Sequence, residues 1–142
     1  MTTKLTRPLY TARATAVGGR SGHVTSDDGI LSFDLQPPKE MGGAGGTTNP
    51  EQLFAAGYAA CFQSALAGVS GRQNVDTSSS TVEADVSIGP IGGGGYGLAV
   101  TLRVTIPGVD ADKARELTEA AHQVCPYSNA TRGNVEVTLE VG

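Results

Sequence analysis

Apolar and polar side chains alternate with a period of two along several stretches of this chain, which is the pattern of β-strands. The alternation is clear over residues 82–88, 98–106 and 135–141. It is weaker over residues 10–17, near the start of the chain. These four stretches predict strands that each present one face to an apolar core.

Turn residues connect some of these strands into pairs. Asp28 and Gly29 stand between residues 23–27 and 30–35, and an Asp-Gly pair in such a place predicts a hairpin turn. The glycine run at 92–95 separates the next two alternating stretches and predicts a second hairpin. Strands joined by hairpins pair antiparallel, so we expect antiparallel sheets.

A long stretch without this alternation predicts the first helix. Asn49 is a suitable cap, Pro50 suits the first helical position, and Gln52 completes a capping box with Asn49. The helix is expected to run to about Val69. It is apolar nearly all round, so we expect it to be central and covered on several sides.

A second helix is predicted to begin near Asp110. Its inward positions are Ala114, Leu117, Ala121 and Val124. Pro126 cannot continue it, so Cys125 is expected at or just past its end. The order is therefore three strands, a helix, two strands, a helix and a strand, which is typical of an α+β fold.

Size and charge restrict the function. The chain has 142 residues, which is enough for a single domain spanning residues 1–142, and its hydrophobic fraction of 39% leaves room for further burial in a dimer. The net charge of −4 and the absence of a basic cluster argue against a nucleic-acid partner. The N-terminal residues lack the apolar core of a secretory signal peptide, which predicts a cytoplasmic protein.

The apolar stretch from Gln52 to Gly71 contains Gln63 and Ser64 and consists largely of small residues. This composition favours a buried helix of a soluble protein over a membrane span. We therefore expect no membrane partner.

The two cysteines, Cys61 and Cys125, are too few for a secreted disulfide framework. They are compatible with inert core positions, with a metal site or with redox chemistry. Together with His23 and His122 they have the ligand types of a zinc site, but the paired local spacing of such sites is absent, and we expect no bound metal. A redox-sensing protein without catalysis would use the same cysteine pair.

Cys61 lies in the middle of the apolar helix and becomes reactive only as a thiolate, which requires a nearby positive charge. Arg20, in the small-residue turn at 18–22, is the best candidate for that charge. A buried arginine needs a carboxylate, and Glu51 stands at the start of the helix.

Glu51 lies ten residues before Cys61, or about 15 Å along one helix, so it cannot reach the Cys61 of its own chain. If both residues serve one site, Glu51 must come from a second chain in a two-fold dimer. Cys125 follows the negative end of a helix, which disfavours a thiolate there and suits a resolving thiol better than a first nucleophile.

Two long motifs resemble those of a known family. Thr48–Phe62, around the first cysteine, and Val124–Asn134, around the second, are similar to the motifs of the organic hydroperoxide resistance (Ohr) proteins of the Ohr/OsmC family. The order of elements fits this family along essentially the whole chain. The resemblance implies an intertwined homodimer whose antiparallel sheets wrap two central helices.

The resemblance also implies chemistry. Cys61 matches the peroxidatic cysteine and Cys125 the resolving cysteine, while Arg20 and Glu51 match the residues that complete the site. The implied substrates are organic hydroperoxides, including those of fatty acids, and the implied reductant is a lipoyl dithiol on a lipoylated protein, with no bound cofactor.

Thiol chemistry then predicts that Cys61 becomes a sulfenic acid and condenses with Cys125 to a disulfide, which a dithiol reopens. Aromatic residues around the cysteines are expected to favour an alkyl hydroperoxide. They are Phe54, Tyr58, Phe62 and Tyr127.

Overall fold

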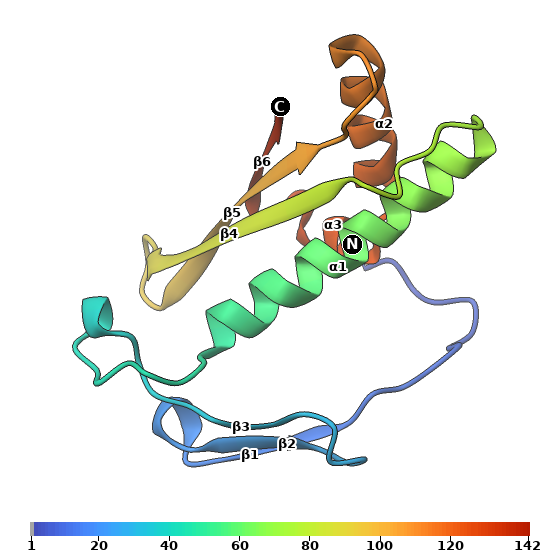
Figure 1. Cartoon of the computed structure of the whole chain (residues 1–142). Coiled ribbons are helices and arrows are strands. Elements are labelled where there is room, and N and C mark those ends of the chain that lie inside the picture. The colour runs from blue at the N-terminus through green and yellow to red at the C-terminus, as the bar shows by residue number, and fades with distance from the viewer. Residues whose placement is uncertain (1) are drawn as a thin grey trace. The chain divides into compact units, whose positions relative to one another are not determined.

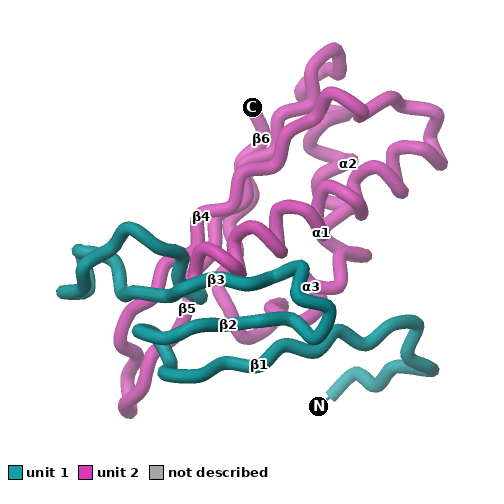
Figure 2. Tube along the Cα trace, turned by 60° about the horizontal axis from the view of Figure 1, so that its bottom comes forward, with its two compact units in different colours: residues 1–50 teal, residues 51–142 magenta. Residues whose placement is uncertain are grey.

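The computed structural model describes residues 2–142 of the chain. The chain divides into two compact units, residues 1–50 and residues 51–142, which Figure 2 shows in teal and magenta. The predicted order of strands and long helices is confirmed along the described chain, with two additional 3₁₀ turns (Gly19–Ser21 and Lys39–Met41) and one short additional α-helix before the last strand.

The first unit contains an antiparallel meander. Its strands are β1 (Ala14–Val17), β2 (His23–Ser26) and β3 (Ser32–Asp34), with β2 in the middle. The predicted turn at Asp28 and Gly29 is present: Gly29 has a φ of 75°, and the Asp28 carboxylate accepts a hydrogen bond from the backbone of Ile30. A left-handed φ favours glycine, which explains the Asp-Gly pair.

The second unit begins with α1 (Pro50–Arg72), which starts at the predicted proline and runs three residues beyond the predicted end at Val69. Its buried side chains are Tyr58, Phe62, Leu66, Val69 and Ser70. By length and composition α1 would also be able to cross a membrane, and 28% of its most apolar window is buried in the described chain. Its buried apolar side chains belong to the core of this unit.

The sheet of this unit consists of β4 (Thr81–Pro90), β5 (Tyr96–Thr105) and β6 (Glu136–Val141), in that order across the sheet. β4 and β5 pair antiparallel around the predicted glycine hairpin. The prediction of antiparallel pairing does not hold for β6, which runs parallel to β5. The chain between these two strands crosses back through helices, and such a crossover returns the strand in the same direction.

One face of this sheet carries buried side chains that belong to the core, and Figure 1 shows the helices of this unit beside the sheet. α1 and α2 (Ala111–Val124) both contribute to it, and Phe62, Leu102 and Leu117 are completely buried there. On the opposite face Arg103 forms ion pairs with acidic side chains of β4 and β6. The alternating apolar and polar residues of the sequence thus lie on the buried and the exposed face of the sheet, respectively.

The predicted start of α2 is confirmed, because the Asp110 side chain accepts a hydrogen bond from the backbone amide of Lys113. α2 ends at Val124, so Cys125 follows its last residue as predicted. The additional helix, α3 (Pro126–Thr131), begins at once with Cys125 as its N-terminal flanking residue. Pro126 ends one helix and also occupies the first position of the next, where proline is well tolerated.

Candidate active site

The structure brings the two cysteines together. The Sγ atoms of Cys61, in the middle of α1, and Cys125, at the junction of α2 and α3, lie 3.9 Å apart. Both are free thiols. A disulfide needs a sulfur–sulfur distance of about 2.05 Å, so a shift of about 2 Å would join them.

The two thiols differ in access. Cys61 is partly exposed and opens onto a pocket of about 500 Å³, whereas Cys125 is completely buried. The other residues lining the pocket are Ser64, Ala65, Gly68, Arg72, Val124 and Pro126. A reagent in solution therefore meets Cys61 first, and Cys125 is placed to react with whatever forms on Cys61.

Burial raises the pKa of the Cys61 thiol above its ordinary value, and the neighbouring Cys125 acts in the same direction. A hydrogen bond from the Tyr127 backbone amide, in the first turn of α3, opposes both effects. Within the described residues, none of the groups that shift this pKa is a cation. The surroundings of Cys61 thus favour the protonated thiol over the thiolate, and an additional positive charge is needed to make Cys61 a thiolate near neutral pH.

Arg20 lies in the first unit, in a short 3₁₀ turn at Gly19–Ser21. Glycines shape this turn: Gly18 has a φ of 82°, and a Cβ on Gly22 would lie 1.7 Å from the carbonyl oxygen of Val17. Only residues without a side chain fit there, so the turn presents Arg20 on a closely folded backbone. Its role beside Cys61 stays a prediction.

Glu51 occupies the first turn of α1. Because α1 is continuous from Pro50 to Arg72, Glu51 and Cys61 are indeed about 15 Å apart along it. Glu51 therefore does not reach the thiol of its own chain, and its part in the site stays a prediction that requires a second chain.

Three of the predicted aromatic residues form one cluster. The rings of Phe54, Tyr58 and Tyr127 lie with centroids 5.7–6.1 Å apart. A Cβ on Gly57 would lie 3.0 Å from the Tyr127 hydroxyl, so this glycine lets the Tyr127 ring approach α1 closely.

The fourth aromatic residue, Phe62, is completely buried and lies beside the imidazole of His122, with ring centroids 6.5 Å apart. Tyr58 is also completely buried, whereas Tyr127 is 38% exposed. That these side chains line a substrate pocket stays a prediction.

A polar network beside the cysteines was missed by sequence reasoning. The Ser128 hydroxyl lies 2.8 Å from the Tyr58 hydroxyl and 2.8 Å from Nδ1 of His122. The Tyr58 hydroxyl is also 3.2 Å from the Thr131 hydroxyl. The sequence offered one signal, because Tyr58, Ser128 and Thr131 all lie inside the two motifs around the cysteines.

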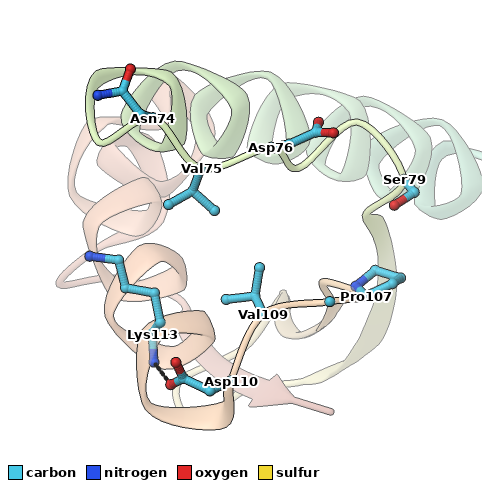
Figure 3. A pocket seen from close by; sticks show the side chains of 9 residues that line it. Asn74, Val75, Asp76, Ser79, Pro107, Val109, Asp110 and Lys113 are labelled. Carbon is cyan, nitrogen blue, oxygen red and sulfur yellow. Dashed lines mark hydrogen bonds between the residues drawn. The ribbon is translucent and has the colours of Figure 1, made fainter.

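Another pocket, of about 510 Å³, lies just beyond the C-terminal end of α1, between the segment after it and the start of α2, and contains no cysteine (Figure 3). Val75 and Val109 face each other across it in that view. Its charged groups have partners: Asp76 accepts a hydrogen bond from the Ser78 backbone amide, Asp110 caps α2, and the Lys113 ammonium is paired with Glu116. These contacts explain the polar lining as structural, so the candidate site is the cysteine pocket.

Residues 2–142 contain no group of three or more His, Cys, Asp or Glu side chains that could hold a metal ion, so the structure gives no support to the zinc alternative. Both ring nitrogens of His23 contact residues of β3, with Nδ1 2.8 Å from Asp34 and Nε2 3.0 Å from Ser32.

Comparisons with known proteins agree with this geometry. Residues 43–140 match the OsmC-like protein family. The organic hydroperoxide resistance protein of Xanthomonas axonopodis pv. citri is 53% identical over 92% of this chain and 93% of its own. OhrB of Bacillus subtilis, also an organic hydroperoxide resistance protein, is 54% identical over 94% of this chain and 98% of its own. The chain belongs to the Ohr branch of the OsmC-like family.

Solved structures support the same assignment. An Ohr protein from Elizabethkingia anophelis is 56% identical, with a TM-score of 0.91 over 96% of this chain and 98% of its own. A protein from Vibrio cholerae, described as an Ohr protein with captopril bound in one of its active sites, is 48% identical, with a TM-score of 0.93 over 97% of this chain and 95% of its own. Membership of the Ohr branch gives the chain a role in resistance to organic peroxide stress.

Proposed function

We propose that the chain is a thiol peroxidase that reduces organic hydroperoxides, including those of fatty acids, to alcohols. The observation that carries the proposal is the cysteine pair: two thiols 3.9 Å apart, of which only Cys61 opens onto a pocket. The Ohr relatives make an organic hydroperoxide the expected occupant of that pocket.

The first step takes place on Cys61. Its thiolate attacks one peroxide oxygen, the O–O bond breaks, and the alkoxide leaves and is protonated to the alcohol. Cys61 is thereby oxidised to a sulfenic acid. The rings of Phe54 and Tyr127 lie beside each other, with centroids 6.0 Å apart, and we propose that they face the peroxide and favour an alkyl hydroperoxide over hydrogen peroxide.

The second step uses Cys125. Its sulfur attacks the Cys61 sulfenic acid, the S–O bond breaks, and the hydroxyl group leaves as water with the thiol proton. A dithiol then reopens the disulfide through a mixed disulfide with the reductant. We propose a lipoyl group on a lipoylated protein as this dithiol. The Vibrio cholerae relative has captopril, which is a thiol, bound in one of its active sites, and this supports access of thiols to the site.

The positive charge that Cys61 needs is assigned to Arg20, held by Glu51, in a homodimer with two composite sites. The spacing along α1 supports this, since Glu51 and Cys61 cannot meet within one chain. The uncovered face of α1 supports it as well, because small side chains let a second helix approach closely. Its small exposed residues are Ala56, Ala60, Ser64, Ala67, Gly68 and Gly71.

Composite sites predict complementation between two inactive variants. Glu51→Gln and Cys61→Ser are each expected to be inactive as pure proteins. After unfolding and refolding together, mixed dimers would hold one complete site, and about a quarter of the parent activity should return, because half of the dimers are mixed and each has one site of two. Activity of the mixture no higher than that of the separate variants would exclude a site shared between chains.

A turnover assay tests the proposed function. The pure protein is given cumene hydroperoxide or hydrogen peroxide with dihydrolipoamide as reductant, and peroxide loss is followed. We expect fast consumption of the organic peroxide, slower consumption of hydrogen peroxide, and far lower rates when monothiol glutathione replaces the dithiol. A single oxidation without turnover would instead favour a redox sensor.

We also propose that the protein acts in the cytoplasm. The two cysteines are too few for a secreted disulfide framework, and a reducing compartment would keep them as the thiols from which the proposed cycle starts. The proposed cycle uses no bound cofactor, so the dithiol is the only reagent that it requires besides the hydroperoxide.

A further inference from the structure

We propose that His122, Ser128 and Tyr58 form a clamp that holds Cys125 against Cys61 and thereby sets how fast the disulfide forms once Cys61 is oxidised. This inference rests on the proposed function, in which Cys125 resolves the Cys61 sulfenic acid. It assigns positioning roles to three residues that do not themselves react.

The clamp joins the three helices that carry the cysteines. His122 lies one turn before Cys125 on α2, and Ser128 lies one turn after it on α3. Tyr58 lies one turn before Cys61 on α1. The Ser128 hydroxyl is within 2.8 Å of both other members, so it ties the bend at Cys125–Pro126 to the turn of α1 that leads to Cys61.

Burial makes these contacts consequential. Tyr58 and Ser128 are completely buried, and Thr131 is 4% exposed. A buried hydroxyl without a partner destabilises the fold around it, so loss of one member would leave the others unsatisfied and free the helix junction to move.

The donors of the network can be assigned from its geometry. The Thr131 hydroxyl donates to the backbone carbonyl of Ser128, so it accepts from Tyr58. Tyr58 in turn accepts from Ser128, because each hydroxyl has one proton to give. Ser128 must then accept from Nδ1–H of His122.

This assignment makes the clamp insensitive to the charge of His122, because Nδ1 carries a proton in the imidazolium and in one neutral tautomer. Burial, and after it the charge of Arg132, lower the pKa of His122, while Glu119 raises it. The Phe62 ring covers the imidazole from α1, and the Arg132 guanidinium donates to the His122 backbone carbonyl.

The position of Cys125 matters because two reactions compete for the oxidised Cys61. In one, Cys125 displaces the hydroxyl group, and the disulfide and water form. In the other, a second hydroperoxide transfers an oxygen to the sulfenate and leaves as alcohol, which gives a sulfinic acid. Misplacement of a reacting group by about 1 Å can cost about a hundredfold in rate, so a loosened junction would shift the outcome toward the sulfinic acid.

The test separates the two steps in variants of the clamp. Ser128→Ala and His122→Leu break it, and His122→Asn keeps a side-chain donor near the position of Nδ1. Thr118→Val is the matched control, because Thr118 is also completely buried but donates its hydroxyl hydrogen bond to Ala114 within α2. The folding of each protein is first checked by circular dichroism. The protein is then mixed with excess cumene hydroperoxide, the reaction is quenched at intervals, and the intact mass is measured by mass spectrometry.

We expect Ser128→Ala and His122→Leu to form the sulfenic acid at close to the parent rate, but the disulfide at least about tenfold more slowly, with a larger final fraction of sulfinic acid. Thr118→Val should match the parent, and His122→Asn should recover most of the disulfide rate. The inference is overturned if the clamp variants form the disulfide as fast as Thr118→Val does, or if both steps slow equally.

A second measurement does not depend on peroxidase activity. The disulfide of Cys61 and Cys125 is equilibrated with glutathione buffers, and the effective concentration of one thiol for the other follows from the equilibrium. The clamp predicts a fall of about tenfold in Ser128→Ala and in His122→Leu and no fall in Thr118→Val. Failure of the parent to react with hydroperoxide would refute the proposed function, whereas unchanged effective concentrations in the variants would refute the clamp alone.

Discussion

Cys61→Ser is expected to lower the consumption of cumene hydroperoxide by more than about a thousandfold, because it removes the nucleophile on which the proposed cycle begins. Serine is nearly the same size, and Cys61 is only partly buried, so the fold should tolerate the change. The measurement is peroxide loss with dihydrolipoamide in excess, together with circular dichroism to confirm folding.

Cys125→Ser serves as the matched comparison, because it changes the other thiol in the same way. It should consume the first equivalent of hydroperoxide per chain at a rate close to that of the parent and then fail to turn over, since the sulfenic acid has no resolving partner and reacts with further hydroperoxide only by slower oxidation to the sulfinic acid. If Cys125→Ser loses the first equivalent as well, or if Cys61→Ser keeps turning over, the assigned roles of the two thiols are wrong.

Arg20→Gln is expected to slow the reaction of Cys61 with hydroperoxide by about 100- to 1,000-fold at pH 7, which is the range for removing one electrostatic stabiliser from an active site. The physical reason lies in the surroundings of the thiol. Burial raises the pKa of Cys61, and Cys125 adds to the increase, so without a cation the thiol form dominates at neutral pH.

The pH dependence of this variant gives a sharper test. Because the pKa of Cys61 is raised, the thiolate fraction at pH 7 is small in Arg20→Gln and should increase about tenfold for each pH unit until that pKa is reached. The rate of the variant should therefore rise steeply through pH 9, while the parent, in which we propose that Arg20 stabilises the thiolate, should already be near its plateau.

Arg13→Gln is the control for charge. Arg13 lies in the same unit, is exposed, and pairs with Asp27 at 3.6 Å, and such a surface pair contributes little. Its rate should equal that of the parent. Equal rates for Arg20→Gln and Arg13→Gln across the pH range would show that another group activates Cys61.

The helices illustrate how far the sequence predicts this structure. Local signals were sufficient at Pro50 and Asp110, where the residue types that start helices mark the observed starts of α1 and α2. Alternation likewise identified β4 and β5, whose inward residues form the core. These features depend on neighbours a few positions apart, so a sequence pattern contains them.

Features that depend on distant residues were not predictable in this way. The direction of β6 follows from the path of the chain through α2 and α3, which no local pattern records. Tyr58 and Ser128 are 70 positions apart, and only the fold brings their hydroxyls together. The motif around Cys125 contains Ser128 but does not show that its hydroxyl bonds His122 and Tyr58.

The candidate site was predicted in part. The motifs identified Cys61 and Cys125, and the fold places their sulfurs 3.9 Å apart. Sequence reasoning placed Cys125 only at the negative end of α2, but α3 starts at the same residue and directs the Tyr127 amide to Cys61. The short helix was missed because Pro126 both ends α2 and begins α3.

In the proposed cycle a hydroperoxide oxidises Cys61, and Cys125 resolves the product to a disulfide. The most direct test is the intact mass and free-thiol content of the reduced protein after one equivalent of cumene hydroperoxide, without any reductant. We expect the loss of two hydrogen atoms and of both thiols, with a peptide map showing Cys61 bonded to Cys125 of the same chain. Two thiols that survive the treatment, or oxidation that spares Cys61, would contradict it.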